Sequence, residues 1–178
     1  MAGPKSHFRA AAIIRSMSYD NLTAHKTESE IGWGVLASAT FNVMNCLQVY
    51  GQGVYGKGIG QFLNDMSLLN VDVVPNPEKE GKMQVLPMMG WFAGMQYNFS
   101  PKVFITSTYG QSRLYSHDGY PTTPSEQYRY GQYLNATLFR NITSDLQVGA
   151  EYLRGWRTDF NGDTRHANRM NLAVQYSF

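Results

Sequence analysis

The chain has 178 residues, of which 43% are hydrophobic, 13% aromatic and only 16% charged. This length suits one domain, and so many aromatic and so few charged residues exclude a disordered chain. No stretch approaches the ~20 consecutive apolar residues of a spanning helix, which excludes a helical membrane protein. The net charge of +2 is too small to favour nucleic acid as a partner.

Apolar and polar residues alternate along most of the chain, as they do in β-strands that have two different faces. Taken in chain order, the segments with this pattern are 8–19, 31–43, 46–56, 87–99, 103–115, 128–140, 146–157 and 169–178. The pattern is clearest in the last segment, where Met170, Leu172, Val174, Tyr176 and Phe178 share a face. The sequence therefore predicts about eight strands, each long enough to cross a bilayer at a tilt.

The connections between these strands alternate in length. Three are short turns, and four are longer polar loops; the turns lie at 44–46, 100–102 and 143–145, and the loops at about 20–29, 57–84, 116–127 and 158–167. Transmembrane barrels are built with short turns on one side and long loops on the other. We therefore predict an all-β fold, a transmembrane antiparallel β-barrel forming one domain over 1–178.

A soluble β-sandwich or a lipocalin-like barrel also has alternating strands and is the main alternative. Three features favour the membrane barrel: the length of the strands, polar faces rich in Gly, Asn, Gln and Thr, and aromatic residues near strand ends. The aromatic residues that we expect to form girdles at the membrane surfaces are Trp33, Phe41, Trp91, Tyr97, Phe99, Phe139, Trp156, Tyr176 and Phe178.

The long loop 57–84 interrupts the strand pattern. Its apolar residues Ile59, Phe62, Leu63, Met66 and Leu69 recur with helical spacing, which predicts a short amphipathic helix. We expect the helix to pack on the barrel rim or on a neighbouring protomer. The alternative is that the loop folds inward and narrows a pore.

Charged residues inside the predicted strands lie opposite the apolar faces. They are Arg9, Arg15, Arg129, Arg157, Arg169 and Glu151. An arginine facing lipid costs roughly 2–4 kcal/mol at mid-membrane, so we predict that these residues face water and line a pore. Five arginines and one acid would attract anions. The alternative is that the charges pair across the wall, as Arg157 and Glu151 would.

Neither catalysis nor metal binding is indicated by the sequence. The single cysteine, Cys46, has no evident catalytic partners, and the four histidines lack the spacing of metal ligands. The glycine-rich run 51–58 lacks the Ser or Thr that a phosphate-binding loop needs after its lysine, and 159–163 lacks the last ligand of a calcium loop. We therefore expect no enzymatic activity, no metal and no cofactor.

Several short segments, in this order, resemble the DcaP-like porins of Gram-negative outer membranes. They are 7–11, 15–19, 55–59, 64–65, 71–74, 90–94, 108–110, 148–152, 167–169 and 175–178. The resemblance implies a sixteen-stranded barrel of which this chain matches the C-terminal half, so we expect a fragment of a longer barrel. It also implies a homotrimer surrounded by outer-membrane lipid, which takes up small, often negatively charged solutes such as dicarboxylates.

Two functions remain open at this point. The first is a passive channel for small hydrophilic, anionic solutes in the outer membrane. The second is a small closed eight-stranded barrel that acts as an anchor or adhesin, because eight strands suffice to close but leave an interior filled by side chains. In either case we expect Leu172, Val174, Tyr176 and Phe178 to form a C-terminal signal for the barrel assembly machinery.

Overall fold

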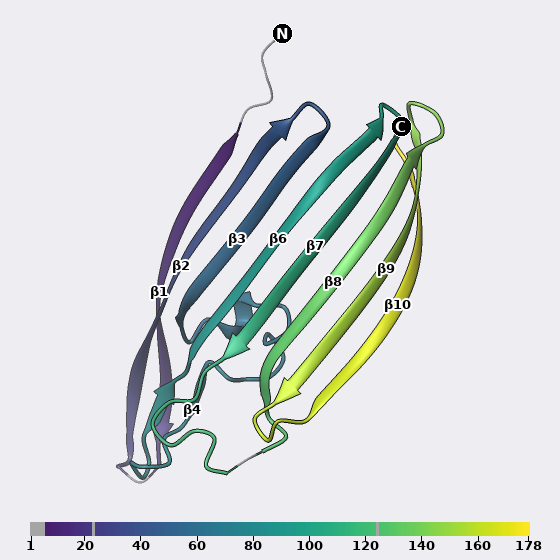
Figure 1. Ribbon diagram of the computed structural model, residues 1–178. Helices are drawn as coiled ribbons and strands as arrows, with labels where there is room; N and C mark the ends of the chain where they lie inside the picture. The colour runs from purple at the N-terminus through teal and green to yellow at the C-terminus, as the bar shows by residue number, and fades with distance from the viewer. Residues whose placement is uncertain (1–5, 23, 124) are drawn as a thin grey trace.

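The computed structural model describes residues 6–22, 24–123 and 125–178 and consists almost entirely of antiparallel strands (Figure 1). One sheet contains β1 (His7–Asn21), β2 (Lys26–Met44), β3 (Leu47–Lys57), β6 (Pro87–Ser100), β7 (Val103–Leu114), β8 (Tyr128–Asn141), β9 (Leu146–Asp159) and β10 (Thr164–Tyr176). Two short strands, β4 (Val73–Pro75) and β5 (Met83–Val85), form a separate hairpin in the long loop. The prediction of an all-β fold with eight long strands is confirmed.

Each strand of the main sheet pairs with its neighbours in the order β1-β2-β3-β6-β7-β8-β9-β10. The sheet is open, because β1 and β10 form its two edges and do not pair with each other. The three short turns and the end of β10 lie at one end of the sheet, at the top of Figure 1, and the long connections lie at the other end. We call these the short-turn end and the long-loop end.

Two of the loops predicted from the sequence are largely strand. The segments 20–29 and 158–167 are polar, but the β1–β2 ladder continues to the pair Asn21–Lys26 and the β9–β10 ladder to Thr158–Thr164. Both faces of the strands are polar in these segments, so the sequence shows no apolar periodicity there and the strand extensions could not be predicted from it. The segment 159–163, which lacks the last ligand of a calcium loop, forms a hairpin turn between β9 and β10 with Gly162 at a φ of 92°.

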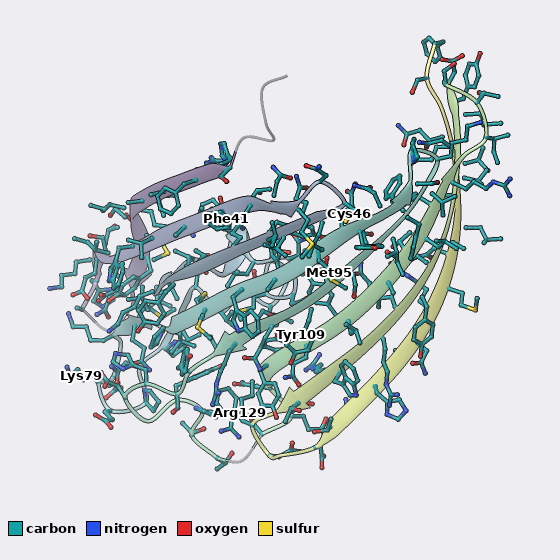
Figure 2. All side chains as sticks on the ribbon, turned by 45° about the horizontal axis from the view of Figure 1, so that its top comes forward. Phe41, Cys46, Lys79, Met95, Tyr109 and Arg129 are labelled. Atoms are coloured by element: carbon teal, nitrogen blue, oxygen red, sulfur yellow. The ribbon has the colours of Figure 1, made fainter. Side chains whose placement is uncertain are left out.

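The two faces of the sheet differ in chemistry. The face that we call outer carries the apolar residues of the alternating pattern, and many of these are exposed, including Ile14, Leu172 and Val174. Figure 2 shows three of the outer-face residues, Phe41, Met95 and Tyr109, between Cys46 at the short-turn end and Lys79 at the long-loop end. The opposite, inner face carries mainly glycine and polar residues. Phe139 is an exception to the predicted girdle, because it lies on the inner face and stacks on Phe104 at 4.9 Å.

The buried apolar core lies between the inner face and the connection 58–86, which folds back over the sheet. Ile59 contacts the position of Gly34 on β2, and Leu63 contacts that of Gly90 on β6. The remaining members of this core are Met66, Val71, Val74, Leu86, Met88, Leu114 and Tyr128. The loop therefore packs on the inner face of the sheet, which contradicts the expected packing on a rim and agrees with the inward direction of the alternative.

The predicted amphipathic helix in this loop does not form. Within the described residues, helix is limited to the 3₁₀ turn η1 (Gly60–Phe62), followed by further turns to Asn70. Ile59, Leu63 and Met66 are buried as the pattern requires, whereas Phe62 is 52% exposed. Among the described residues, no helix has the length and apolar character needed to span a membrane.

Candidate functional site

Four of the five arginines singled out from the sequence lie on the inner face. Arg9 and Arg15 occupy β1, and the register places Arg15 opposite Gly32 of β2. The side chains of Arg15 and Met17, both on β1, cover the space beside Gly32. Arg157 on β9 and Arg169 on β10 lie at the other side of the sheet. The predicted inner-face arginines therefore form two groups, one near each edge.

Two of these arginines have carboxylate partners. Arg15 Nη1 lies 2.8 Å from Asp72 Oδ2 of the inward loop and also donates a hydrogen bond to the Gly58 carbonyl oxygen at 3.0 Å. Arg157 Nε lies 2.7 Å from Oδ1 of Asp159, whose side chain is only 1% exposed. The pairing of Arg157 with Glu151, which was the alternative to a pore-lining role, is not the one that forms, because Asp159 lies two residues along the same strand and is buried beside the guanidinium.

Glu151 instead accepts hydrogen bonds from amide and hydroxyl groups on both neighbouring strands. Its Oε2 accepts from Asn135 Nδ2 and from Thr137 Oγ1, both at 3.2 Å, and its Oε1 accepts from Asn171 Nδ2 at 2.6 Å. These bonds link β8, β9 and β10 across the inner face. Among the described residues Glu151 therefore contacts neutral donors and makes no ion pair with the inner-face arginines.

A hollow of about 680 Å³ lies between the inner face of β8–β10 and the inward loop. Arg157, Arg165 and Arg169 line it from the sheet, and Asn64 and Asp65 line it from the loop. Asp65 accepts a hydrogen bond from Ser112 Oγ of β7, which holds the loop beside the hollow.

Arg165 was not predicted as a site residue, because 158–167 was assigned to a loop. It lies opposite Arg157 in the β9–β10 register and is separated from Asp159 and Glu126 by 3.9 and 4.0 Å. The alternation of Arg165, Ala167 and Arg169 was the signal that could have identified it.

Arg129 departs from the expected inner-face position. The pairing between β8 and β9 shifts between Tyr128 and Tyr130, and this irregularity lies at Arg129. Its guanidinium lies 6.0 Å from the centre of the ring of Tyr130, which pairs with the outer-face residue Arg113. A residue added at a bulge changes the face of its neighbours, so the strand period could not place Arg129.

The apolar region of the outer face ends along a line that crosses the strands obliquely. On β1 the outer-face residues are apolar from Phe8 to Ile14 and polar from Ser16 on, and on β10 they are apolar from Tyr176 back to Met170 and polar from Asn168 on. Following the strand pairs, Ile14 lies opposite Trp33 of β2. Starting from Met170 on β10, the successive cross-strand partners lead across the sheet to Phe41 on β2. They are Tyr152, Ala136, Ser107, Met95 and Val49.

This boundary therefore moves from position 33 to position 41 of β2 as the sheet is crossed, a shift of eight residues. At ~3.3 Å per residue along a strand and ~4.8 Å between the eight neighbouring strands, the boundary makes an angle of about 38° with the direction perpendicular to the strands. If the apolar edge follows a flat surface, the strands must therefore be tilted by the same angle from the normal to that surface.

No cluster that could bind a metal ion is present in the part of the chain that the structure describes. Cys46 is a free cysteine in the turn between β2 and β3. The glycine-rich run 51–58 lies on β3 and in the turn that follows it, not in a loop before a helix.

Comparison with solved structures identifies a similar fold. The chain matches the crystal structure of the outer membrane channel DcaP of Acinetobacter baumannii with a TM-score of 0.75 and 20% sequence identity. The match covers 96% of this chain and 47% of that channel, so this chain spans just under half the length of the channel. No protein-family model and no curated protein matches the sequence. The fold of this chain is therefore similar to about half of that channel, and the resemblance to the DcaP-like porins that the sequence suggests is confirmed at the level of the fold.

Proposed function

We propose that the eight-stranded sheet is part of the wall of an outer-membrane barrel in a Gram-negative bacterium. The oblique apolar boundary carries this proposal. If its edge follows a membrane surface, the strands are tilted by about 38°, which falls within the 35–45° of transmembrane barrels. A soluble sandwich has no physical reason to expose an apolar band whose edge shifts by eight residues between β1 and β10.

The open sheet supports closure by further strands and disfavours the small closed barrel. In an eight-stranded barrel β1 would pair with β10, whereas these strands are the two edges of the sheet. A barrel of twice this number of strands requires a further segment of comparable size, in agreement with the 47% of the DcaP channel that this chain covers. The chain then acts as the C-terminal half of one membrane domain, and the channel assembles as a trimer.

Within that barrel the inner face lines a passive channel for small hydrophilic, anionic solutes of the dicarboxylate type. Arg169, which makes no ion pair among the described residues, and Arg165, whose carboxylate partners lie at 3.9 and 4.0 Å, supply the positive field. Arg15 and Arg157 contribute less to this field, because Asp72 and Asp159 neutralise them at close range. The inward loop narrows the passage opposite this wall.

The test is the reversal potential of the full-length protein in a planar bilayer under a potassium chloride gradient. We expect anion preference in the wild type and a lower anion-to-cation permeability ratio in Arg169→Gln and Arg165→Gln. Arg140→Gln is the matched control, because Arg140 lies on the outer face of β8, opposite Val148 in the register, near the short-turn end. Cation preference, or an equal effect of the control, would overturn the proposed selectivity, and absence of conductance would overturn the channel.

A further inference from the structure

Three arginines gather on the outer face of β7–β9, at the long-loop end, and each lies over an aromatic ring. The Arg113 guanidinium carbon is 5.1 Å from the ring centre of Tyr115 and 5.7 Å from that of Tyr130. Arg129 approaches the same Tyr130 ring at 6.0 Å, and Figure 2 shows Arg129 at this end of the sheet. Arg154 on β9 lies 5.1 Å from the ring centre of Trp156. We call Arg113, Arg129 and Arg154 the outer arginine cluster.

These arginines lack the carboxylate partners that the inner face provides. None of the three makes an ion pair within the described residues, whereas Arg15 and Arg157 do. The Arg113 Nε is buried and has no hydrogen-bond partner in this part of the structure. Positive charge held in place by aromatic rings, without a protein anion beside it, is complementary to an anion from outside the chain.

The position of the cluster relative to the apolar boundary indicates which anion it meets. On β7 the outer-face residues up to Tyr109 are apolar except for Ser107, and Gln111 and Arg113 beyond Tyr109 are polar. On β9 the continuous run of apolar outer-face residues ends at Tyr152, and Arg154 and then Trp156 follow it on the same face. The cluster therefore begins directly beyond the apolar band, at the level where lipid head groups meet a barrel and where aromatic residues form their girdle.

The cluster is also confined to one side of the sheet. At the corresponding level on β1 and β2 the outer-face residues are Ser16, Ser18, Thr27 and Ser29, none of which is basic. On β3 a single basic residue, Lys57, follows the apolar Tyr55 on this face. Among the described residues, outer-face arginines stacked on aromatic rings are limited to the three adjacent strands β7–β9, as a binding site for a discrete ligand requires.

We propose that the outer arginine cluster binds the phosphate groups of a phosphorylated lipid in the leaflet on the long-loop side. Guanidinium groups bind phosphate oxygens through two parallel N–H donors, and their planar faces remain free to stack on aromatic rings. Tyr115, Tyr130 and Trp156 hold the guanidinium groups against the wall, and the apolar band below them contacts the acyl chains. This proposal rests on the membrane barrel of the proposed function and adds a ligand on its outer wall.

The experiment measures lipid binding to the full-length protein in nanodiscs of phosphatidylcholine that contain lipid A, a diphosphorylated glycolipid, or its dephosphorylated form. Native mass spectrometry counts the lipid A molecules that remain bound. We expect retention of lipid A over the dephosphorylated lipid, and about tenfold or greater loss of affinity in the Arg113→Gln/Arg154→Gln double variant. Arg140→Gln is the control, because this arginine lies on the same face of β8 but near the short-turn end.

Each other outcome contradicts the proposal in a distinguishable way. Equal retention of both lipids would show that phosphate is not recognised, and unchanged affinity in the double variant would show that the cluster is not the site. A smaller oligomer in the double variant, measured by light scattering, would assign the cluster to a contact between protomers. Conductance is recorded in parallel: normal conductance without lipid selection overturns this inference alone, whereas failure to insert overturns the proposed function.

Discussion

At the scale of single residues, glycine decides how closely neighbouring strands and the inward loop approach. A Cβ added at Gly56 would clash with the Trp33 carbonyl oxygen and would lie 2.7 Å from the Gly34 Cα, which are both backbone atoms of the adjacent strand. By contrast, Gly53 on the same strand has no atom within 4 Å of an added Cβ. The glycine run that superficially matches a phosphate-binding loop is therefore a strand that is packed most tightly at Gly56 and is open at Gly53.

Substituting Gly56→Ala should destabilise the protein, because β2 and β3 must move apart to relieve a contact between backbone atoms. Overpacking of this kind costs about 1–3 kcal/mol. The measurement is the urea midpoint for unfolding from lipid vesicles, with Gly53→Ala as the matched control on the same strand. Equal midpoints for the two variants would show that the close approach at Gly56 is not maintained in the membrane.

The charge at Glu28 gives a second prediction at this scale. Glu28 lies at the long-loop end of β2, where the outer-face residues Thr27 and Ser29 are polar, outside the apolar band. Its carboxylate pairs with Lys26 at 2.9 Å and Lys82 at 2.6 Å, and these ammonium groups lower the pKa of Glu28 from 4.5 to about 2. Glu28 also accepts a hydrogen bond from Tyr19, whose hydroxyl accepts one from the Met83 amide.

Because the pKa is lower when the pair is formed, the pair stabilises the loop fully above pH 4.5, and this stabilisation is lost as the pH falls towards 2. We expect the hydrogen-exchange protection of 76–86, corrected for the intrinsic exchange rate, to be constant from pH 7 to pH 5 and to decrease below pH 4.5. In Glu28→Gln, protection should be lower at pH 7 and should not change over this range. If protection in the wild type were as independent of pH as in the variant, the ion pair between Glu28 and Lys82 would not stabilise the loop.

At the scale of elements, the long loop is the part of the fold that the sequence predicts least well. The eight strands could be predicted because each has one apolar and one polar face, and this difference appears in the sequence as a two-residue alternation. The apolar stripe of the loop correctly predicts burial of Ile59, Leu63 and Met66 but not its partner, which is the inner face of distant strands. The helix is absent because Gly60 and the tertiary contacts of Asp72 stabilise tight turns instead.

The same limit applies to the candidate site. The face of Arg9, Arg15, Arg157 and Arg169 follows from strand periodicity, whereas the partners of these residues do not. Asp72 and Asp159 reach their arginines through the fold of the loop and through a strand end that was taken for a loop. Charge neutralisation, and therefore which arginines remain to attract a solute, depends on these tertiary contacts.

The ion pair between Arg15 and Asp72 fastens the loop to β1, and its removal should loosen the loop. The two side chains are only 22% and 19% exposed, so Asp72→Asn leaves a largely buried guanidinium without a carboxylate and should cost about 1–3 kcal/mol. The measurement is the rate of tryptic cleavage after Lys79 and Lys82 in the folded protein, which we expect to rise. Asp163→Asn, in the β9–β10 turn, is the control and should leave cleavage of the loop unchanged.

At the scale of the whole molecule, the two faces of the sheet predict opposite responses to the same substitution on adjacent residues. Leu172 lies on the outer face of β10 and is 85% exposed, whereas Ala173 lies on the inner face opposite Gly149. In a membrane, Leu172→Arg should destabilise the protein by up to ~2–4 kcal/mol, and Ala173→Arg should have little effect. The measurement is urea unfolding from vesicles, and equal losses for the two variants would argue against a lipid-facing outer surface.

The free edge of β10 and the end of the chain provide the last prediction. An unpaired edge strand offers main-chain donors and acceptors to a partner strand, and side chains at alternate positions then determine specificity. Leu172, Val174, Tyr176 and Phe178 provide such a series, and Phe178 lies beyond the last residue of β10. We therefore expect the barrel assembly machinery to recognise this strand and its terminal aromatic side chain.

Deletion of Phe178 from the full-length protein should leave export intact and reduce insertion. The ladder between β9 and β10 ends at the pair Leu146–Tyr176, so the deletion removes none of the paired residues and should change the stability of assembled barrels little. The folded fraction is measured by heat-modifiable migration on a gel, together with the amount recovered in the outer membrane. Phe178→Tyr, which retains the aromatic ring, is the matched control and should insert normally. A normal yield of folded protein without Phe178 would exclude the terminal residue as an assembly signal, whereas loss of yield in both variants would show that more than the ring is recognised.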